Sequence, residues 1–208
     1  SLKLVIKLPQ VWFNCIYIGL MFAIVTAFAA LWAVPLVMNQ YHTSATVAAA
    51  SSAWIFIGVA IGAALSGALA DRLGRCKPVM LVFSILSAIL MAVVLYVSLP
   101  LAMMVLVFFV LGMAVGAYVL PFSIVKKLTP PNVHGVSLAF TNMFGILLGA
   151  PLLQPLIGWM MGTEDLHYCR ILPVTNYQLA LSPLVVVLVL AVIVTFFIRE
   201  SNIPIVRR

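Results

Sequence analysis

Four charged side chains in one short turn offer most of the chemistry in this sequence. The residues that carry charge between Lys7 and Lys126 are Asp71, Arg72, Arg75 and Lys77. A carboxylate there can accept hydrogen bonds from the start of another helix, and the two arginines suit the C-terminal end of the preceding helix. Gly74 suits a left-handed helix cap, and we expect Gly67 to let the preceding helix pack closely. This chemistry is ion pairing and hydrogen bonding at a helix junction.

The elements that position this turn are long apolar segments. The chain is 65% hydrophobic and 7% charged, with a mean hydropathy of +1.27. Asp, Glu, Lys and Arg are absent from 8–70, 78–125, 128–163 and 171–198. A membrane span needs roughly 20 apolar residues, so the first two stretches hold two spans each and the last two hold one each. The runs are continuous rather than alternating, which argues against a β-barrel.

The sequence therefore predicts an all-α membrane protein with six transmembrane helices in a single bundle over residues 1–208. The expected spans are approximately 11–38, 47–70, 78–98, 101–125, 136–161 and 178–198. We expect the first span to lean or kink near Pro35, and the fifth to be interrupted by Pro151 and Pro155. Glycines spaced four apart predict close helix contacts on three spans. These pairs are Gly58/Gly62, Gly112/Gly116, Gly145/Gly149 and Gly158/Gly162.

The basic residues are distributed very unevenly between the two sides of a six-span chain. Of the 11 lysines and arginines, only Arg170 falls on the side opposite the others. This bias predicts that both termini, the 71–77 turn and the 126–135 loop are cytoplasmic, where basic residues meet anionic headgroups. It argues against a nucleic-acid partner. Cys15, Cys76 and Cys169 fall in different compartments, so no disulfide framework is expected.

The charged turn resembles the cytoplasmic signature of the major facilitator superfamily, G-x-L-a-D-r-x-G-R-(K/R)-x. The matching residues are Gly67, Leu69, Asp71, Arg72, Gly74 and Arg75. Cys76 departs from the pattern where a basic residue is usual, although Lys77 follows it. The resemblance implies a gating role for this loop at the cytoplasmic side. It also implies a bacterial inner (plasma) membrane location.

Two further segments indicate which part of the family fold this chain resembles. Residues 141–159 are similar to the eleventh helix of bacterial members, and Leu31-Trp-Ala-Val-Pro35 is similar to the seventh. The resemblance thus implies the C-terminal six-helix half, helices 7–12, of a transporter whose halves rock around a central cavity. Because the chain begins with Ser1 rather than Met, we expect a fragment. The alternatives are that two copies pair, or that a separate chain supplies the N-terminal half.

The candidate substrate-binding residues are polar or aromatic side chains inside the spans, namely Trp32, Tyr118, Asn142 and Gln154. Family resemblance places the first and fourth helices of a half along the cavity, which favours Trp32 and Tyr118 as groups that stack on a ligand and donate hydrogen bonds. Trp32 could equally mark the outer membrane interface, and Tyr118 could bond a neighbouring helix. Asn142 and Gln154 are either ligand contacts or packing contacts.

No span contains an acidic residue. Since proton-coupled carriers usually keep a membrane-embedded carboxylate, we expect a coupling group in the other half or a uniport mechanism. The uncharged wall favours a neutral or zwitterionic small-molecule substrate. We expect no metal or cofactor.

An enzymatic function is not expected. An intramembrane serine protease needs a Gly-x-Ser-Gly turn and a histidine base. Ala64-Leu-Ser-Gly67 lacks the first glycine, and 178–198 contains no histidine. A non-transporting membrane scaffold or assembly subunit remains an alternative to a transporter. The expected partners are the lipid bilayer, a small solute, and the N-terminal six-helix half or a second copy.

Overall fold

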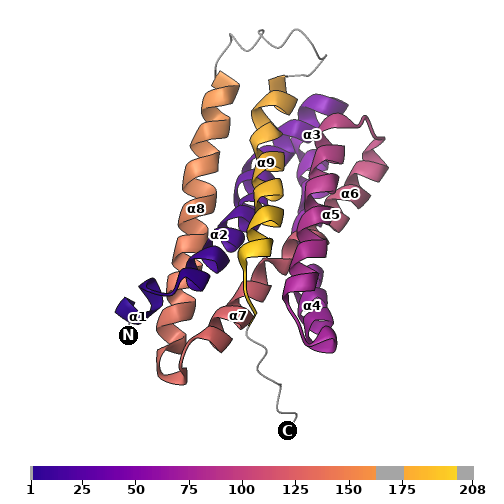
Figure 1. Cartoon of the computed structure of the whole chain (residues 1–208). Coiled ribbons are helices and arrows are strands. Elements are labelled where there is room, and N and C mark those ends of the chain that lie inside the picture. Colours follow the sequence, from indigo (N-terminus) through magenta and orange to yellow (C-terminus); the bar gives the residue numbers. More distant parts are fainter. Residues whose placement is uncertain (1, 163–175, 201–208) are drawn as a thin grey trace.

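The computed structural model describes residues 2–162 and 176–200, and every regular element in them is a helix (Figure 1). Six of its helices are long and apolar enough to cross a membrane, which confirms the predicted number. A short α1 (Leu2–Ile6) was not expected. The elements that form the spans are α2 (Pro9–Ala23), η1 (Ile24–Trp32) and α3 (Ala33–Tyr41); α4 (Ala45–Leu73); α5 (Lys77–Tyr96); α6 (Leu101–Val115), η2 (Gly116–Val119) and α7 (Leu120–Leu128); η3 (Pro131–Val133) with α8 (His134–Gly162); and α9 (Asn176–Phe197).

Local sequence explains where the helices begin and end. The first span starts at Pro9, where a missing N–H costs nothing, and the Ser44 hydroxyl accepts from the Val47 N–H at the start of α4. The chain leaves α7 at Thr129, just before two prolines that cannot continue it. Most of the expected outer loop, with Arg170 and Cys169, lies outside the described residues.

Pro151 and Pro155 act differently from expectation. Helix α8 runs without a break through Pro151 and Pro155, so the predicted interruption of the fifth span is wrong. A proline inside a membrane helix removes one backbone bond, which neighbouring groups can replace. Pro35 lies within α3, and the irregular part of the first span comes before it. There η1 is a nine-residue π-helix, whose hydrogen bonds skip one residue more than those of an α-helix.

Helices α4 and α6 meet at a seam of glycines. A Cβ placed on Gly58, Gly62, Gly112 or Gly116 would overlap backbone atoms of the facing helix. We call these four residues the glycine seam. They confirm the prediction for two of the glycine pairs. A Cβ on Gly145 would overlap the Ile18 side chain and touch the Gly19 backbone N. A Cβ on Gly158 would meet nothing within 4 Å, so the prediction of close backbone contact at Gly158 is wrong.

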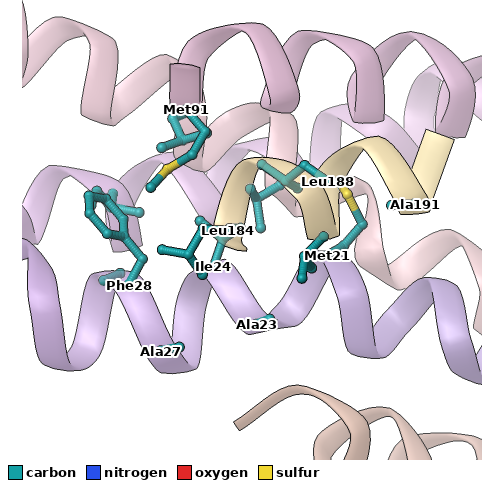
Figure 2. Close-up of a cluster of buried hydrophobic side chains, with 14 of the residues drawn as sticks. Met21, Ala23, Ile24, Ala27, Phe28, Met91, Leu184, Leu188 and Ala191 are labelled. Carbon is teal, nitrogen blue, oxygen red and sulfur yellow. The ribbon is translucent and has the colours of Figure 1, made fainter. Parts of the chain in front are cut away.

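The first span occupies the middle of the bundle. Figure 2 shows its Met21, Ile24 and Phe28 facing Met91 of α5 and Leu184 of α9, all of them buried. The lower part, α2, packs on α8 and α9, whereas α3 packs on α4. The start of α2 and the end of α9 lie at one end of the bundle, together with the end of α7 (Figure 1). That end also holds the charged turn.

Candidate functional site

The charged turn is closed by its own backbone. Helix α4 ends at Leu73, and Gly74 adopts a left-handed conformation with φ of 66°. The Arg75 N–H then donates to the Ala70 carbonyl at 3.2 Å. This is the cap that the sequence predicts for Gly74. The prediction of close packing at Gly67 is wrong for the described residues, because a Cβ there would meet nothing within 4 Å.

Three of the four charged side chains of this turn are exposed. Asp71, Arg72 and Arg75 are all exposed, and none of them has an ion-pair partner in residues 2–162 and 176–200. A pocket of about 370 Å³ lies between this turn and α7. Its charged lining residues are Asp71, Lys126 and Lys127. We call it the basic pocket.

The start of α5 is bonded to the end of α9. The Lys77 ammonium donates to the carbonyls of Phe196 and Ile198, each at 2.9 Å. In return, the Glu200 carboxylate accepts the backbone N–H of Cys76. The Lys77 ammonium thus meets carbonyls at the end of α9, and the Glu200 carboxylate meets an N–H at the start of α5. Each charge has the sign that the helix dipole favours at that end.

A third helix joins the same junction through Gln10. Its side-chain Nε2 donates to the Phe197 carbonyl at 3.2 Å, and its Oε1 accepts from the Arg199 N–H at 2.8 Å. One amide therefore satisfies a donor and an acceptor at the end of α9. We call the contacts of Gln10, Lys77 and Glu200 the polar ties.

Cys76 lies beside the polar ties and is buried at the wall of the basic pocket. Burial raises its pKa to about 11, with the Glu200 carboxylate adding to the rise and Lys127 opposing it. The thiol is therefore neutral at physiological pH and unreactive as a nucleophile.

Two of the four candidate substrate residues converge on the first span. The Gln154 side chain donates from Nε2 to the Thr26 carbonyl of η1 at 2.9 Å. Phe22 lies one turn before Thr26 in the first span, and the Tyr118 ring packs against it with ring centroids 5.0 Å apart. The Thr26 hydroxyl joins these positions by donating to the Phe22 carbonyl at 3.1 Å. Gln154 of α8 therefore contacts the π-helical segment, and Tyr118 of η2 contacts the last turn of α2 just before it.

The other two candidates lie apart from this junction. Trp32 is half-buried at the last position of η1, and its indole nitrogen is buried without a hydrogen-bond partner among the described residues. Asn142 is exposed on α8. It precedes Gln154 by twelve residues, or roughly 18 Å along a helix axis. The four side chains thus do not form one cluster within this chain.

The sequence did not predict several long-range polar contacts. Gln10, Lys77 and Glu200 bond to partners more than a hundred residues away, and no local pattern predicts such pairs. Thr26 gave no indication of a π-helical turn. Among the described residues, no three His, Cys, Asp or Glu side chains are placed to hold a metal ion.

Comparison with known proteins adds a family and a fold. A family model described as Major Facilitator Superfamily matches residues 16–207. The structure of the MFS proton:xylose symporter XylE bound to 6-bromo-6-deoxy-D-glucose is similar with a TM-score of 0.75 and 18% identity, over 92% of this chain and 45% of that one. The inward-open conformation of the xylose transporter XylE from E. coli is similar with a TM-score of 0.62 and 19% identity. This match covers 97% of this chain and 48% of that one.

This chain thus spans about half the length of the solved structures that it matches. At these identities the likeness shows the fold alone. A sequence search of curated proteins finds no significant match.

Proposed function

The chain belongs to the major facilitator superfamily, and from that premise we propose that it is one half of a twelve-helix transporter that moves a small solute by alternating access. As a family member with six apolar helices, it is a multi-pass membrane protein whose general function is transport. The observation that carries the proposal is the match over residues 16–207 together with a fold that covers about half of a complete transporter. In that architecture the solute cavity lies between two six-helix halves.

The proposed complement of this chain is an N-terminal six-helix half, with a second copy as the other arrangement. The resemblance of α8 to the eleventh helix and of the first span to the seventh supports the C-terminal half for this chain. We place the end with the charged turn, and therefore both termini, on the cytoplasmic side of a bacterial inner membrane. The excess of lysine and arginine at that end supports this orientation.

The proposed solute contacts are Trp32, Tyr118, Gln154 and Asn142. The indole N–H of Trp32 is buried and has no protein partner among the described residues, so a solute acceptor would satisfy it once the alternating-access movement exposes it. Gln154 holds a backbone carbonyl of the π-helical segment and can offer its other amide positions to a ligand. Because the apolar stretches that hold these four side chains carry no charged residue, a neutral or zwitterionic solute fits them best.

The proposed cytoplasmic gate is the loop formed by Gly67, Asp71, Arg72, Gly74 and Arg75. Asp71 is exposed and has no ion-pair partner in the described part of the chain, so it is free to dock on a helix start of the opposite half. Its replacement by asparagine in the intact transporter should slow transport and leave membrane insertion unchanged.

Solute uptake tests the proposal. Vesicles holding the transporter that contains this chain are screened with a panel of neutral and zwitterionic solutes, with and without an imposed proton gradient. Trp32→Phe keeps the ring but removes the donor, and it should lower uptake several-fold while leaving the thermal unfolding midpoint unchanged.

Trp159→Phe is the matched control, because Trp159 is 68% exposed on α8. No uptake of any solute above that of empty vesicles would count against transport and favour a scaffold. Uptake that the Trp32 variant leaves intact would remove Trp32 from the solute wall.

A further inference from the structure

We propose that the basic pocket binds a phosphate-bearing anion, and that its natural occupant is the headgroup of an anionic phospholipid. The pocket is lined by the end of α4, the turn that follows it, and α7. The lining residues that could contact an anion are Ser123, Lys126 and Lys127. The proposal rests on the proposed function in taking this end of the bundle as the cytoplasmic one, and it assigns the bound lipid to the state in which Asp71 is not docked on the opposite half.

Charge balance is the first argument. The two carboxylates at this end, Asp71 and Glu200, are outnumbered by cations, and Glu200 is already occupied by the Cys76 N–H. The cations of the turn and of α7 are Arg72, Arg75, Lys77, Lys126 and Lys127. Lys77 is bonded to backbone carbonyls, whereas the other four have no ion-pair partner in the described residues. An excess of unpaired cations around a concave site attracts an anion.

The chemistry of the donors favours phosphate. Two adjacent ammonium groups and a hydroxyl supply several rotatable donors without a fixed fork, which suits a tetrahedral oxyanion that is held from more than one side. Ser123, Lys126 and Lys127 are all exposed, so none is committed to the protein interior. A volume of about 370 Å³ falls within the roughly 300–1,000 Å³ that small-ligand sites occupy.

Position in the membrane favours a lipid as the source of that phosphate. The spans Ala45–Leu73 and Leu101–Leu128 both end at the pocket, which places it where headgroups lie. Large apolar side chains are exposed on α4 and α5 at and near this level. Leu73 and Val82 are each 60% exposed, and Leu65 is 40% exposed. The exposed apolar side chains show that the spans leading to this level face lipid, and basic pockets between spans on this side bind anionic lipid headgroups.

Asp71 gives the proposal a directional test. Its carboxylate lines the pocket with the two lysines, so it repels the same anion that they attract. Removing the carboxylate should therefore strengthen binding, whereas removing the lysines should weaken it. A site that merely needed an intact turn would be damaged by both changes.

Native mass spectrometry of the purified chain in mild detergent measures the affinity. The probes are dioctanoyl phosphatidylglycerol, dioctanoyl phosphatidylcholine, whose charge is neutralised by choline, and inorganic phosphate. We expect phosphatidylglycerol to bind more tightly than phosphatidylcholine. Lys126→Gln with Lys127→Gln should weaken it by roughly tenfold or more, and Asp71→Asn should tighten it. The double variant Lys7→Gln with Arg199→Gln is the control, because it also removes two positive charges from this end of the bundle but outside the pocket. It should change the affinity for phosphatidylglycerol less than twofold.

The outcomes separate the sources of the anion. If inorganic phosphate displaces phosphatidylglycerol at equal concentration, the ligand is a soluble phosphate compound and the lipid assignment is overturned. Equal binding of the two lipids, or equal weakening by the control pair, would overturn the site itself. Because this measurement needs no solute movement, a failed uptake experiment leaves it intact, and a failed binding experiment leaves transport intact.

Discussion

The glycine seam and the polar ties hold helices together in opposite ways. At the seam, α4 and α6 touch through their backbones, and no side chain lies between them at Gly58 or Gly112. At the ties, α2, α5 and α9 are joined by side-chain hydrogen bonds that reach across to helix ends. A backbone contact has no alternative partner, whereas an amide or an ammonium can exchange one acceptor for another. The bundle therefore combines a fixed wall, where backbones touch, with a junction that depends on side-chain hydrogen bonds.

The largest effect should come from filling the seam. Gly112→Leu would force a side chain into the Ile55 carbonyl, and small-to-large changes in a packed interior cost about 1–3 kcal/mol or more. We expect the free energy of unfolding to fall by at least about 3 kcal/mol, because backbone rather than side-chain atoms must move. Thermal unfolding in detergent measures the change. Gly158→Leu is the matched control and should be nearly neutral, and equal losses in the two variants would contradict the distinction.

A smaller loss should follow from cutting one of the ties. Lys77→Met keeps the length of the side chain but leaves the carbonyls of Phe196 and Ile198 without their donor. Hydrogen bonds to charged groups contribute about 1.5–3 kcal/mol to the free energy of unfolding. Because Lys77 is partly exposed, we expect this variant to lose only about 1 kcal/mol. Hydrogen exchange at the end of α9 should rise, with Lys7→Met as the control. Unchanged exchange there would show that the tie does not hold α9.

The link between α8 and the π-helical segment should contribute less. Gln154→Leu removes the bond to the Thr26 carbonyl, and such interhelical bonds average about 0.6 kcal/mol in membrane proteins. We expect a small drop in the unfolding midpoint and faster hydrogen exchange within η1. Gln40→Leu, at an exposed site of α3, serves as the control. A drop as large as that of Gly112→Leu would place this link with the fixed wall instead.

The smallest effect at neutral pH concerns the thiol beside the ties. Burial raises the Cys76 pKa from 9.0 to about 11, so the unfolded chain loses this proton before the folded one does. The contribution of Cys76 to stability is therefore complete below about pH 9 and is lost as the pH rises through about 11. Unfolding midpoints between pH 8 and 11 should fall more steeply for the natural chain than for Cys76→Ser. Identical slopes would mean that the thiol is not enclosed in the folded protein.

The same contrast explains what could be predicted from the sequence. Six spans follow from composition, since a bilayer demands long apolar helices whatever their partners. The contacts of Gly58, Gly62, Gly112 and Gly116 follow from spacing, because a missing side chain permits backbone approach on one face. The left-handed Gly74 follows from its place at the end of a helix. Each of these is a local property of the chain.

The polar contacts could not be predicted in this way. Gln154 could have bonded to any carbonyl within reach, and only the packing of α8 on the first span selects Thr26. The same holds for Lys77 and Glu200, whose partners depend on where α9 ends. The π-helical turns had no distinct composition, and Pro35 pointed to the neighbourhood of the irregularity without fixing its place. Tertiary structure supplies these contacts.

The π-helical segment also changes what a single crossing can do. A π-helix has more residues per turn than an α-helix, so it rotates the helix faces that follow it. The residues after Trp32 therefore face other directions than they would if the α-helix before Ile24 continued unchanged. The part before this segment, α2, packs on α8 and α9, and the part after it, α3, packs on α4. One continuous membrane crossing is therefore built from two parts that pack on separate neighbours, and the π-helical segment is where the change of neighbours occurs.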